Sequence, residues 1–448
     1  MGEIHKFIFK GKRLVLDVES NALHEFDQVA WQVLELLERG DGDAEIAAHL
    51  APVYGADAVK GALSEIRLLQ REGLLFSEAR ESGSSAPAVV KALCLFAADN
   101  CNLRCRYCFV EQGRPHREET LMSETVGKAA IDFLVAASGP RRHLEIDFFG
   151  GEPLLNWPVV REIAAYARKL GASRGKTFGF TVTTNGVLLT PQVASYLEQE
   201  GFAAVLSLDG RPAIHDRMRK TAAGDGSYET VLPRIRDYAL AEPRGGCYIR
   251  GTYTRFNLDF CRDVEHLYSL GFRHISMEPV VAPPGQDYAL REEDLPRLEE
   301  EYERLVDFYL HCREAGDPFT FFHFEIDLER GPCLPKRLSG CGAGREYLAV
   351  TAAGEIYPCH QLAGRKELKL GHVLDPDHIS LALPESFIPA GPLEGRCRRC
   401  WARYHCGGGC RAASYLNGEP GEPYYLECAL QRKRLECALY LQSVKGGV

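Results

Sequence analysis

The strongest constraint on the fold is a series of short apolar runs that alternate with helical patterns. Six such runs occupy residues 89–98, 143–151, 177–186, 203–210, 247–255 and 273–281. This alternation favours parallel β-α units, in which helices cover the strands. In a barrel of such units, reactive groups gather at the carboxyl ends of the strands. The sequence therefore predicts an α/β domain over residues 89–315, built as a partial (β/α)6 TIM-like barrel.

Two further regions flank this domain. Residues 1–80 combine strand-like runs in KFIFKGKRLVLDVES with amphipathic helices around 28–39, 43–53 and 57–72, and they resemble a winged-helix module. The segment ESGSSAPA at 81–88 is rich in Ser, Gly, Ala and Pro and is predicted to be a linker. Beyond about residue 316 the alternation stops and cysteines become frequent, so residues 316–448 are predicted to form a third, loop-rich domain.

Composition limits the classes of function. The 448-residue chain carries a formal net charge of −9, so no nucleic-acid partner is expected. Lys6, Lys10, Lys12 and Arg13 interrupt the apolar start, and no stretch reaches membrane-spanning length. We therefore expect a cytoplasmic protein without a membrane partner. Its 16 cysteines then indicate metal or redox chemistry more than structural disulfides.

A cysteine triplet follows the first predicted strand. Cys101, Cys105 and Cys108 form a CxxxCxxC pattern in a loop before a predicted helix. Soft thiolate ligands suit Fe–S centres, and three of them leave one iron of a cubane cluster open to a small molecule. A zinc knuckle or chance spacing is the alternative, although structural zinc prefers four local ligands.

The triplet, with Tyr107 before its last cysteine and with FFGGEP at 148–153, resembles the radical S-adenosylmethionine (SAM) superfamily. The resemblance implies a [4Fe–4S] cluster whose open iron is chelated by the methionyl amino and carboxylate groups of SAM. It also implies that the amino group is received by the turn formed by Gly150, Gly151, Glu152 and Pro153. Reduction of the cluster would then break the sulfonium and yield a 5′-deoxyadenosyl radical.

Four other residues are weaker candidates for SAM contacts. Ser207 and Asp209 end the fourth run in SLDG, and Arg219 follows in HDRMR, where they could meet the ribose hydroxyls and the carboxylate. Asn185 in TTNG holds a similar position after the third run. The alternative for each is an ordinary strand-end turn or a solvated helix start.

A second set of cysteines lies in the last third of the chain. It comprises Cys341, Cys359, Cys397, Cys400, Cys406, Cys410 and Cys428. The spacing resembles the SPASM extension of radical SAM enzymes, which holds two auxiliary clusters and would bring the total to three [4Fe–4S] clusters. The resemblance assigns Cys397, Cys400, Cys406 and Cys428 to the second auxiliary cluster and Cys341, Cys359 and Cys410 to the first.

The first auxiliary cluster then needs a fourth ligand, which Cys333 or a substrate thiolate could supply. A pair of zinc sites is the alternative for the whole array. Neighbouring arginines, Arg403 among them, could offset thiolate charge.

The N-terminal unit resembles the PqqD-like element that many peptide-modifying enzymes fuse to this core. In that family a leader peptide adds as a strand to the sheet of the element and packs against a helix. A DNA-binding winged helix is the alternative, but residues 1–80 show no basic recognition helix. The resemblance therefore implies a peptide partner bound through its leader.

Taken over its whole length, the chain resembles maturases of short cysteine-rich (SCIFF-type) precursor peptides, which form thioether links. The implied reaction begins with hydrogen abstraction from an acceptor residue, often threonine. A substrate cysteine thiolate held at the first auxiliary cluster then captures the carbon centre. A low-potential electron donor, flavodoxin or ferredoxin, is implied as a second partner.

Other functions are also compatible with the sequence. Sulfatase-type maturases share the three-cluster plan but use a carboxylate base beside a cluster cysteine, where this chain has His360 in YPCH. His360 could still serve as a catalytic base. A peptide epimerase and a carbon–carbon crosslinker are further enzymatic alternatives, and a zinc-binding winged-helix scaffold is the non-enzymatic one.

Overall fold

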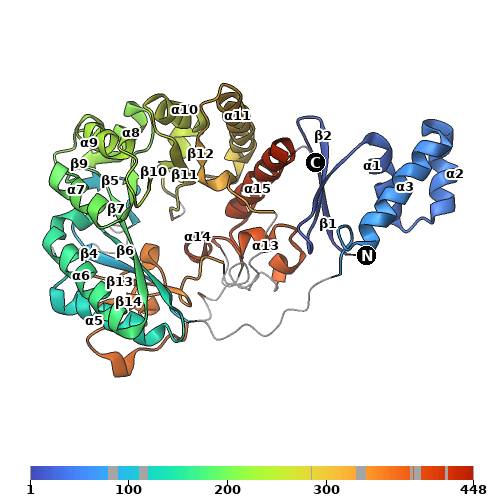
Figure 1. Cartoon of the computed structure of the whole chain (residues 1–448). Coiled ribbons are helices and arrows are strands. Elements are labelled where there is room, and N and C mark those ends of the chain that lie inside the picture. Colours follow the sequence, from blue (N-terminus) through green and yellow to red (C-terminus); the bar gives the residue numbers. More distant parts are fainter. Residues whose placement is uncertain are drawn as a thin grey trace.

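The computed structural model describes residues 2–78, 89–109, 120–283, 285–328, 340–383, 387, 395–418 and 422–446. The predicted linker and Cys333 lie outside these residues. We call residues 2–78 the N-terminal module and residues 340–446 the C-terminal region. Figure 1 shows the barrel at one end of the molecule, the N-terminal module at the other, and the C-terminal helices between them.

The barrel sheet contains all six predicted strands. They are β4 (Ala92–Ala98), β6 (His143–Gly150), β7 (Thr177–Thr184), β8 (Ala203–Ser207), β10 (Cys247–Tyr253) and β11 (His274–Pro279). Neighbours pair in this order, and every pair is parallel. The expected alternation of strands and helices is therefore confirmed.

Helices cover the outer face of the sheet (Figure 1). They are α5 (Glu124–Ala137), α6 (Trp157–Arg174), α7 (Pro191–Gln199), α8 (Pro212–Met218), α9 (Tyr228–Leu240), α10 (Cys261–Ser269) and α11 (Leu295–Glu314). Alternate residues of β6, Leu144, Ile146 and Phe148, are buried in the same apolar core as these helices. Because successive strand residues point to opposite faces, Asp147 and Phe149 face the inside of the barrel. We call this interior the lumen.

The sheet continues beyond the six predicted strands at both edges. β12 (Thr320–Phe321) pairs in parallel with β11, and β13 (Tyr347–Val350) pairs in parallel with β4. β14 (Glu355–Tyr357) and β15 (Gly371–His372) then follow in antiparallel order. The C-terminal region is thus part of the barrel sheet. The prediction that regular alternation stops at about residue 316 missed these strands, which are too short to show a periodic pattern.

The N-terminal module has a three-stranded antiparallel sheet and three helices. Its elements are β1 (Ile4–Phe9), β2 (Lys12–Asp17), β3 (Leu23–Phe26), α1 (Gln28–Arg39), α2 (Asp43–Tyr54) and α3 (Ala56–Arg71). The helices agree with the expected ranges. One face of the sheet, including Val15 and Phe26, packs against these helices. The other face, including Phe9, packs against α15 (Tyr425–Gly446), where Phe9 lies 4.8 Å from the ring of Tyr440.

Polar contacts also hold the N-terminal module against the C-terminal region. Arg403 in α13 (Arg403–Cys406) donates hydrogen bonds to Glu19 (2.6 Å) and Glu3 (2.5 Å). The ring of His5 stacks on Trp401 at 3.8 Å. Arg403, which we expected to offset thiolate charge, is therefore engaged by two carboxylates of the N-terminal module.

Three further short elements are β5 (Leu103–Cys105), β9 (Arg219–Thr221) and α14 (Arg411–Asn417), and short 3-10 helices such as Pro153–Asn156 and His360–Leu362 connect some of the elements. β5 and β9 pair in antiparallel register, so the cysteine triplet includes a strand as well as a loop. Within the described residues, no helix is both long and apolar enough to cross a bilayer.

Candidate active site

A pocket of about 150 Å3 opens at the carboxyl ends of the barrel strands. Ten residues singled out from the sequence line it: Cys101, Cys105, Tyr107, Cys108, Gly150, Gly151, Asn185, Ser207, Arg219 and His360. They come from the segments at the carboxyl ends of β4, β6, β7 and β8 and from the C-terminal region. The structure therefore brings the barrel residues together with His360, which lies far from them in the sequence. Glu152, Pro153 and Asp209 are not on its surface.

The cysteine triplet is shaped by the β5–β9 pair. Cys105 lies opposite Arg219 in that pair, and the side-chain amide of Asn185 donates to Cys101 Sγ at 3.5 Å. Burial raises the pKa of the Cys105 thiol to about 12, although the nearby Arg219 cation acts in the opposite direction. A metal that displaces this proton would therefore have to compensate for burial.

The arrangement differs from that of a mononuclear metal site. Among the residues that the structure describes, no three histidine, cysteine or acidic side chains converge as the ligands of one metal ion do. The thiolates of an Fe–S cubane bind different iron atoms and need not meet at a point. All three thiols of the triplet line the same pocket.

Asp209 fastens the triplet loop to the end of β8. It is fully buried, accepts a hydrogen bond from Tyr107 Oη, and forms an ion pair with Arg219 Nε at 3.1 Å. Its other oxygen accepts from the backbone N–H of Thr252 at 3.0 Å. Asp209 therefore orients Tyr107 and Arg219 from behind the pocket, a role that the sequence pattern did not indicate.

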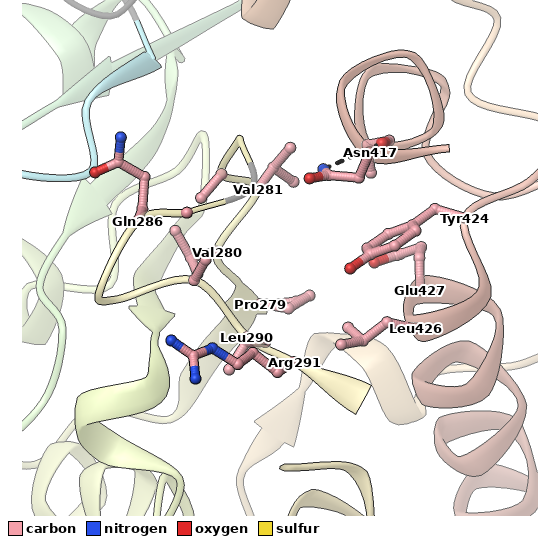
Figure 2. A pocket seen from close by; sticks show the side chains of 14 residues that line it. Pro279, Val280, Val281, Gln286, Leu290, Arg291, Asn417, Tyr424, Leu426 and Glu427 are labelled. Atoms are coloured by element: carbon pink, nitrogen blue, oxygen red, sulfur yellow. Dashed lines mark hydrogen bonds between the residues drawn. The ribbon is translucent and has the colours of Figure 1, made fainter. Parts of the chain in front are cut away.

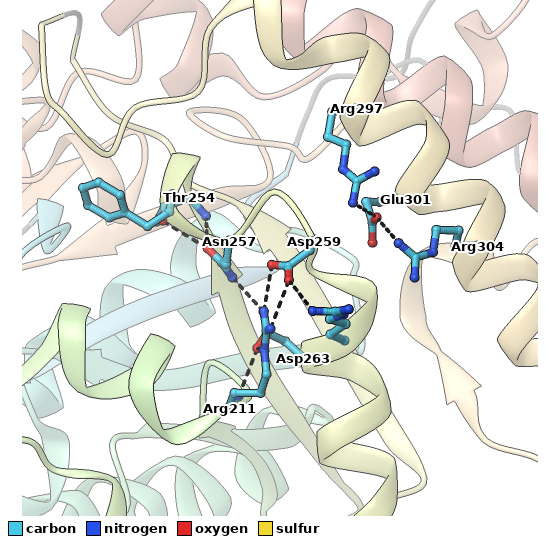
Figure 3. Close-up of polar contacts among 10 residues, drawn as sticks. Arg211, Thr254, Asn257, Asp259, Asp263, Arg297, Glu301 and Arg304 are labelled. Atoms are coloured by element: carbon cyan, nitrogen blue, oxygen red, sulfur yellow. Dashed lines mark hydrogen bonds and ion pairs between the residues drawn. The ribbon is translucent and has the colours of Figure 1, made fainter.

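A second set of ion pairs holds the Asp209 turn from outside (Figure 3). Arg211 donates to Asp263 Oδ1 from Nε at 2.7 Å and to Asp259 through both terminal nitrogens at 3.0 and 2.8 Å. Asp263 is fully buried and also accepts from Asn257 at 3.0 Å. These residues were not found from the sequence, because their contacts depend on a loop about 50 residues further along the chain.

Glu152 ties the turn after β6 to the end of β7. Its carboxylate accepts hydrogen bonds from Leu154 N (3.1 Å), Thr184 Oγ1 (2.7 Å) and Asn185 N (2.9 Å). Burial raises the pKa of this carboxyl to about 7, despite these three hydrogen bonds. Glu152 thus lies beneath the pocket wall that Gly150, Gly151 and Asn185 form.

Gly150 cannot be replaced without strain. Its φ is +123°, and a Cβ built on it would lie 2.2 Å from the carbonyl oxygen of Ala98. We expect Gly150→Ala to lower the free energy of unfolding by about 3 kcal/mol, from left-handed strain and overlap combined. Gly175→Ala is the matched control, since φ there is +65° but nothing lies within 4 Å, and about 1 kcal/mol is expected. Urea denaturation of the metal-free protein measures both, and equal losses would show that the contact with Ala98 is unimportant.

Polar side chains also line the lumen below the pocket. His360 Nδ1 and Tyr347 Oη share a hydrogen bond of 2.6 Å, and Asp147 accepts from Thr183 at 3.1 Å. Arg250 and Glu278 reach the same pocket from β10 and β11. We did not single these two out from the sequence, although a charged residue at an inward position of an apolar strand is a recognisable signal. Together these groups could bind a polar substrate and transfer protons.

A second cavity of about 280 Å3 adjoins the pocket, because Pro279, Val280 and Val281 line both. Its far wall belongs to the C-terminal region. Figure 2 shows Tyr424 and Glu427 projecting from the start of α15 toward the loop that follows β11. The pocket at the strand ends is therefore bordered by a cavity large enough for side chains of a bound chain.

The cysteines of the C-terminal region form two groups in space. Burial raises the pKa of Cys410, and the nearby Cys359 and Cys341 raise it further. Burial likewise raises the pKa of Cys428 to about 11, with contributions from Cys397 and Cys400, and the pKa of Cys406 to about 12, with a contribution from Cys428. The same partition was implied by the resemblance, and each group could hold one cluster.

Comparison with known proteins adds independent information. Residues 96–239 match the model of the Radical SAM superfamily. The chain is 24% identical over 354 residues to a cysteine-type anaerobic sulfatase-maturating enzyme of Clostridium novyi (strain NT), covering 73% of this chain and 88% of that protein. It is 28% identical over 360 residues to mycofactocin maturase MftC of Mycobacterium tuberculosis (strain ATCC 25618 / H37Rv), covering 78% and 84%.

Solved structures show the same fold. Native anSMEcpe with bound AdoMet and Kp18Cys peptide superposes with a TM-score of 0.62 at 19% identity, over 80% of this chain and 99% of that one. Streptococcus suis SuiB bound to precursor peptide SuiA gives a TM-score of 0.53 at 15% identity, over 95% and 98%. The second likeness extends over almost the whole chain.

Proposed function

We propose that this chain, whose residues 96–239 match the Radical SAM superfamily and which is similar to sulfatase-maturating and mycofactocin-maturing enzymes, installs thioether crosslinks in a ribosomally made precursor peptide. Each link joins a cysteine sulfur to a carbon of an acceptor residue. One observation carries the proposal: the cysteine triplet, the glycine turn after β6, Ser207, Arg219 and His360 line a single pocket.

The walls of the pocket suit SAM beside a [4Fe–4S] cluster. Such a cluster on Cys101, Cys105 and Cys108 supplies the electron that yields the 5′-deoxyadenosyl radical from SAM. Gly150 and Gly151 would let the methionyl group approach the backbone, while Ser207 and Arg219 would contact the ribose and the carboxylate. Glu152 and Asp209 act from behind, by holding these walls in place. A flavodoxin or ferredoxin is the proposed electron donor.

The two groups of C-terminal cysteines suit two auxiliary clusters. The group of Cys341, Cys359 and Cys410 has three thiols, so Cys333 or a substrate thiolate would complete it. In the proposed reaction the acceptor C–H bond breaks as its hydrogen passes to the adenosyl radical, and the substrate cysteine gives up its proton. A C–S bond would form, and the surplus electron would pass to the cluster that Cys341, Cys359 and Cys410 could hold. His360, next to Cys359 and on the pocket wall, is the proposed proton acceptor.

The N-terminal module is the proposed leader-binding unit. Its strand order is β1-β2-β3, so β1 and β3 each have one strand neighbour among the described residues. An added peptide strand could form hydrogen bonds with the backbone N–H and C=O groups at the outer edge of β1 or of β3. The same module is fixed to the C-terminal region through Arg403, so the proposed leader site would lie on the body that holds the auxiliary cysteines.

Formylglycine formation is the second candidate. It is favoured by the likeness to the sulfatase-maturating enzyme, whereas His360 in place of a carboxylate beside the cluster cysteine favours thioether formation. The two products differ chemically. A thioether removes two hydrogens per link and retains sulfur, while a formylglycine made from cysteine loses sulfur.

Mass spectrometry of a modified peptide tests the proposal. A short cysteine-rich peptide encoded next to the gene is incubated anaerobically with the reconstituted enzyme, SAM and dithionite. We expect the loss of two hydrogens per link and cysteines that resist alkylation. Fully alkylatable cysteines at unchanged mass would contradict thioether formation, and loss of sulfur would establish the second candidate. A colourless, zinc-containing protein would exclude both.

A further inference from the structure

The lumen contains a cation that the proposed chemistry does not use. Arg250 lies in the middle of β10, between Ile249, which is buried in the core under the helices, and Gly251. Since strand residues alternate, the Arg250 side chain points into the lumen. It lines the pocket together with the cysteine triplet and His360.

Within the part of the chain that the structure describes, the guanidinium group of Arg250 makes no hydrogen bond and no ion pair, although its five N–H groups are partly buried. The second arginine of the pocket differs in this respect, since Arg219 is paired with Asp209 at 3.1 Å. A partly buried cation without a partner is costly, so a site of this kind is adapted to an anionic ligand.

Two carboxyl groups that interact with Arg250 through charge have other contacts. Asp147 accepts a hydrogen bond from Thr183 at 3.1 Å, and Glu278 Oε1 lies 3.4 Å from His323 Nε2, whose pKa burial lowers to about 4. Burial raises the pKa of Asp147 to about 7, so this group carries only part of a negative charge near neutral pH. Both lie near enough to act on Arg250 through charge alone. They therefore reduce its positive potential without occupying its hydrogen-bond donors.

Part of the pocket wall is apolar, since Phe109, Phe149, Pro279 and Val280 line it. The pocket thus offers one bidentate cationic donor together with an apolar patch near the triplet. This combination selects a carboxylate and fixes its direction, because a guanidinium binds both carboxylate oxygens in one plane.

We propose that Arg250 binds a carboxylate of the peptide substrate and thereby positions the reacting residue between the cysteine triplet and His360. The inference rests on the proposed function, since it assumes a peptide in the lumen. The carboxylate could belong to an acidic side chain or to the free C-terminus of the peptide. Both present the same group to the arginine, and the experiment below separates them.

Binding of synthetic peptides to the reconstituted full chain with SAM tests the inference. The probes are Ac-Gly-Cys-Thr-Asp-Gly-NH2, its Asn counterpart, and Ac-Gly-Cys-Thr-Gly with a free C-terminus. We expect one carboxylate-bearing probe to bind about tenfold to a hundredfold more tightly than the Asn peptide. Whether the aspartate or the free-acid probe shows this preference identifies the source of the carboxylate.

Three variants make the test specific. Arg250→Gln should abolish the preference, Arg250→Lys should retain part of it, and Arg174→Gln, at an exposed position on α6, should leave it unchanged. Affinity for SAM and deoxyadenosine formation without peptide should stay within about twofold of wild type in Arg174→Gln, and the Arg250 variants should lose the peptide preference without a matching loss of SAM affinity. Equal binding of all probes by the wild type, or an equal preference in Arg250→Gln, would overturn the inference. Weakened SAM binding in Arg250→Gln would also overturn it, by assigning Arg250 to SAM. Absence of deoxyadenosine in the wild type would instead refute the proposed function.

Discussion

Replacing Cys105 with alanine should reduce deoxyadenosine formation by roughly a thousandfold or more, because the triplet then has too few thiolates to hold a cluster in the pocket. The thiol lines the pocket and lies on β5 opposite Arg219. Its loss removes a ligand but no apolar core. Reconstituted wild-type protein should contain about twelve irons per chain, and the variant about eight. Iron analysis and chromatography of the reaction under dithionite measure both quantities.

Cys247→Ala is the matched control for this prediction. Cys247 is also a partly buried strand cysteine, but it begins β10 at the amino end of the barrel strands, away from the pocket. Iron content and SAM cleavage should therefore match those of the wild type. Undiminished deoxyadenosine formation by Cys105→Ala would mean that the cleavage site lies elsewhere in the chain. Parallel loss in both variants would indicate a general effect on folding.

The barrel could be predicted because its strands are long enough to show their pattern. β6 and β7 each span eight residues, and each is followed by a helix of nine or more residues. The short strands carried no such signal. β12 has two residues and β13 has four, and each is a strand because it pairs with an existing edge of the sheet.

The candidate site could be predicted where residues are close in sequence and carry distinctive chemistry. The cysteine triplet and the glycine turn after β6 meet this condition. Arg403 does not meet this condition, because its partner Glu19 lies 384 residues away and because other basic residues surround Arg403 in the sequence. The roles of Asp209 and Glu152 were also hidden, because only the folded chain shows that both are buried behind the pocket.

Arg250 illustrates an intermediate case. The run CYIRGTYT alternates in polarity, so the period of two already places Arg250 and Thr252 on the same face. What the sequence does not show is which face meets the lumen and which meets the helices. That distinction depends on Ile249 and Tyr253 packing into the core with α10 and α11.

A variant of the C-terminal array should separate SAM cleavage from peptide modification. Cys400→Ala is expected to leave deoxyadenosine formation within about tenfold of wild type while the crosslinked peptide falls below detection. The reason is spatial, since no residue between 395 and 418 lines the pocket at the strand ends. Cys400 instead lies beside Cys397 and Cys428, and its carbonyl oxygen accepts a hydrogen bond from Arg403 at 3.2 Å.

The contact with Arg403 adds a second readout to this variant. If a cluster on Cys400 fixes the loop that carries Arg403, its loss should also weaken the ion pairs with Glu3 and Glu19 that dock the N-terminal module. Hydrogen exchange in β1 and β2 should then rise in Cys400→Ala.

Glu19→Gln serves as the comparison, because it weakens docking of the N-terminal module while leaving every cysteine in place. Modification lost in Cys400→Ala but retained in Glu19→Gln would assign the cluster a part in electron transfer. Equal loss of SAM cleavage in Cys400→Ala and Cys105→Ala would instead show that the auxiliary site supports the barrel itself.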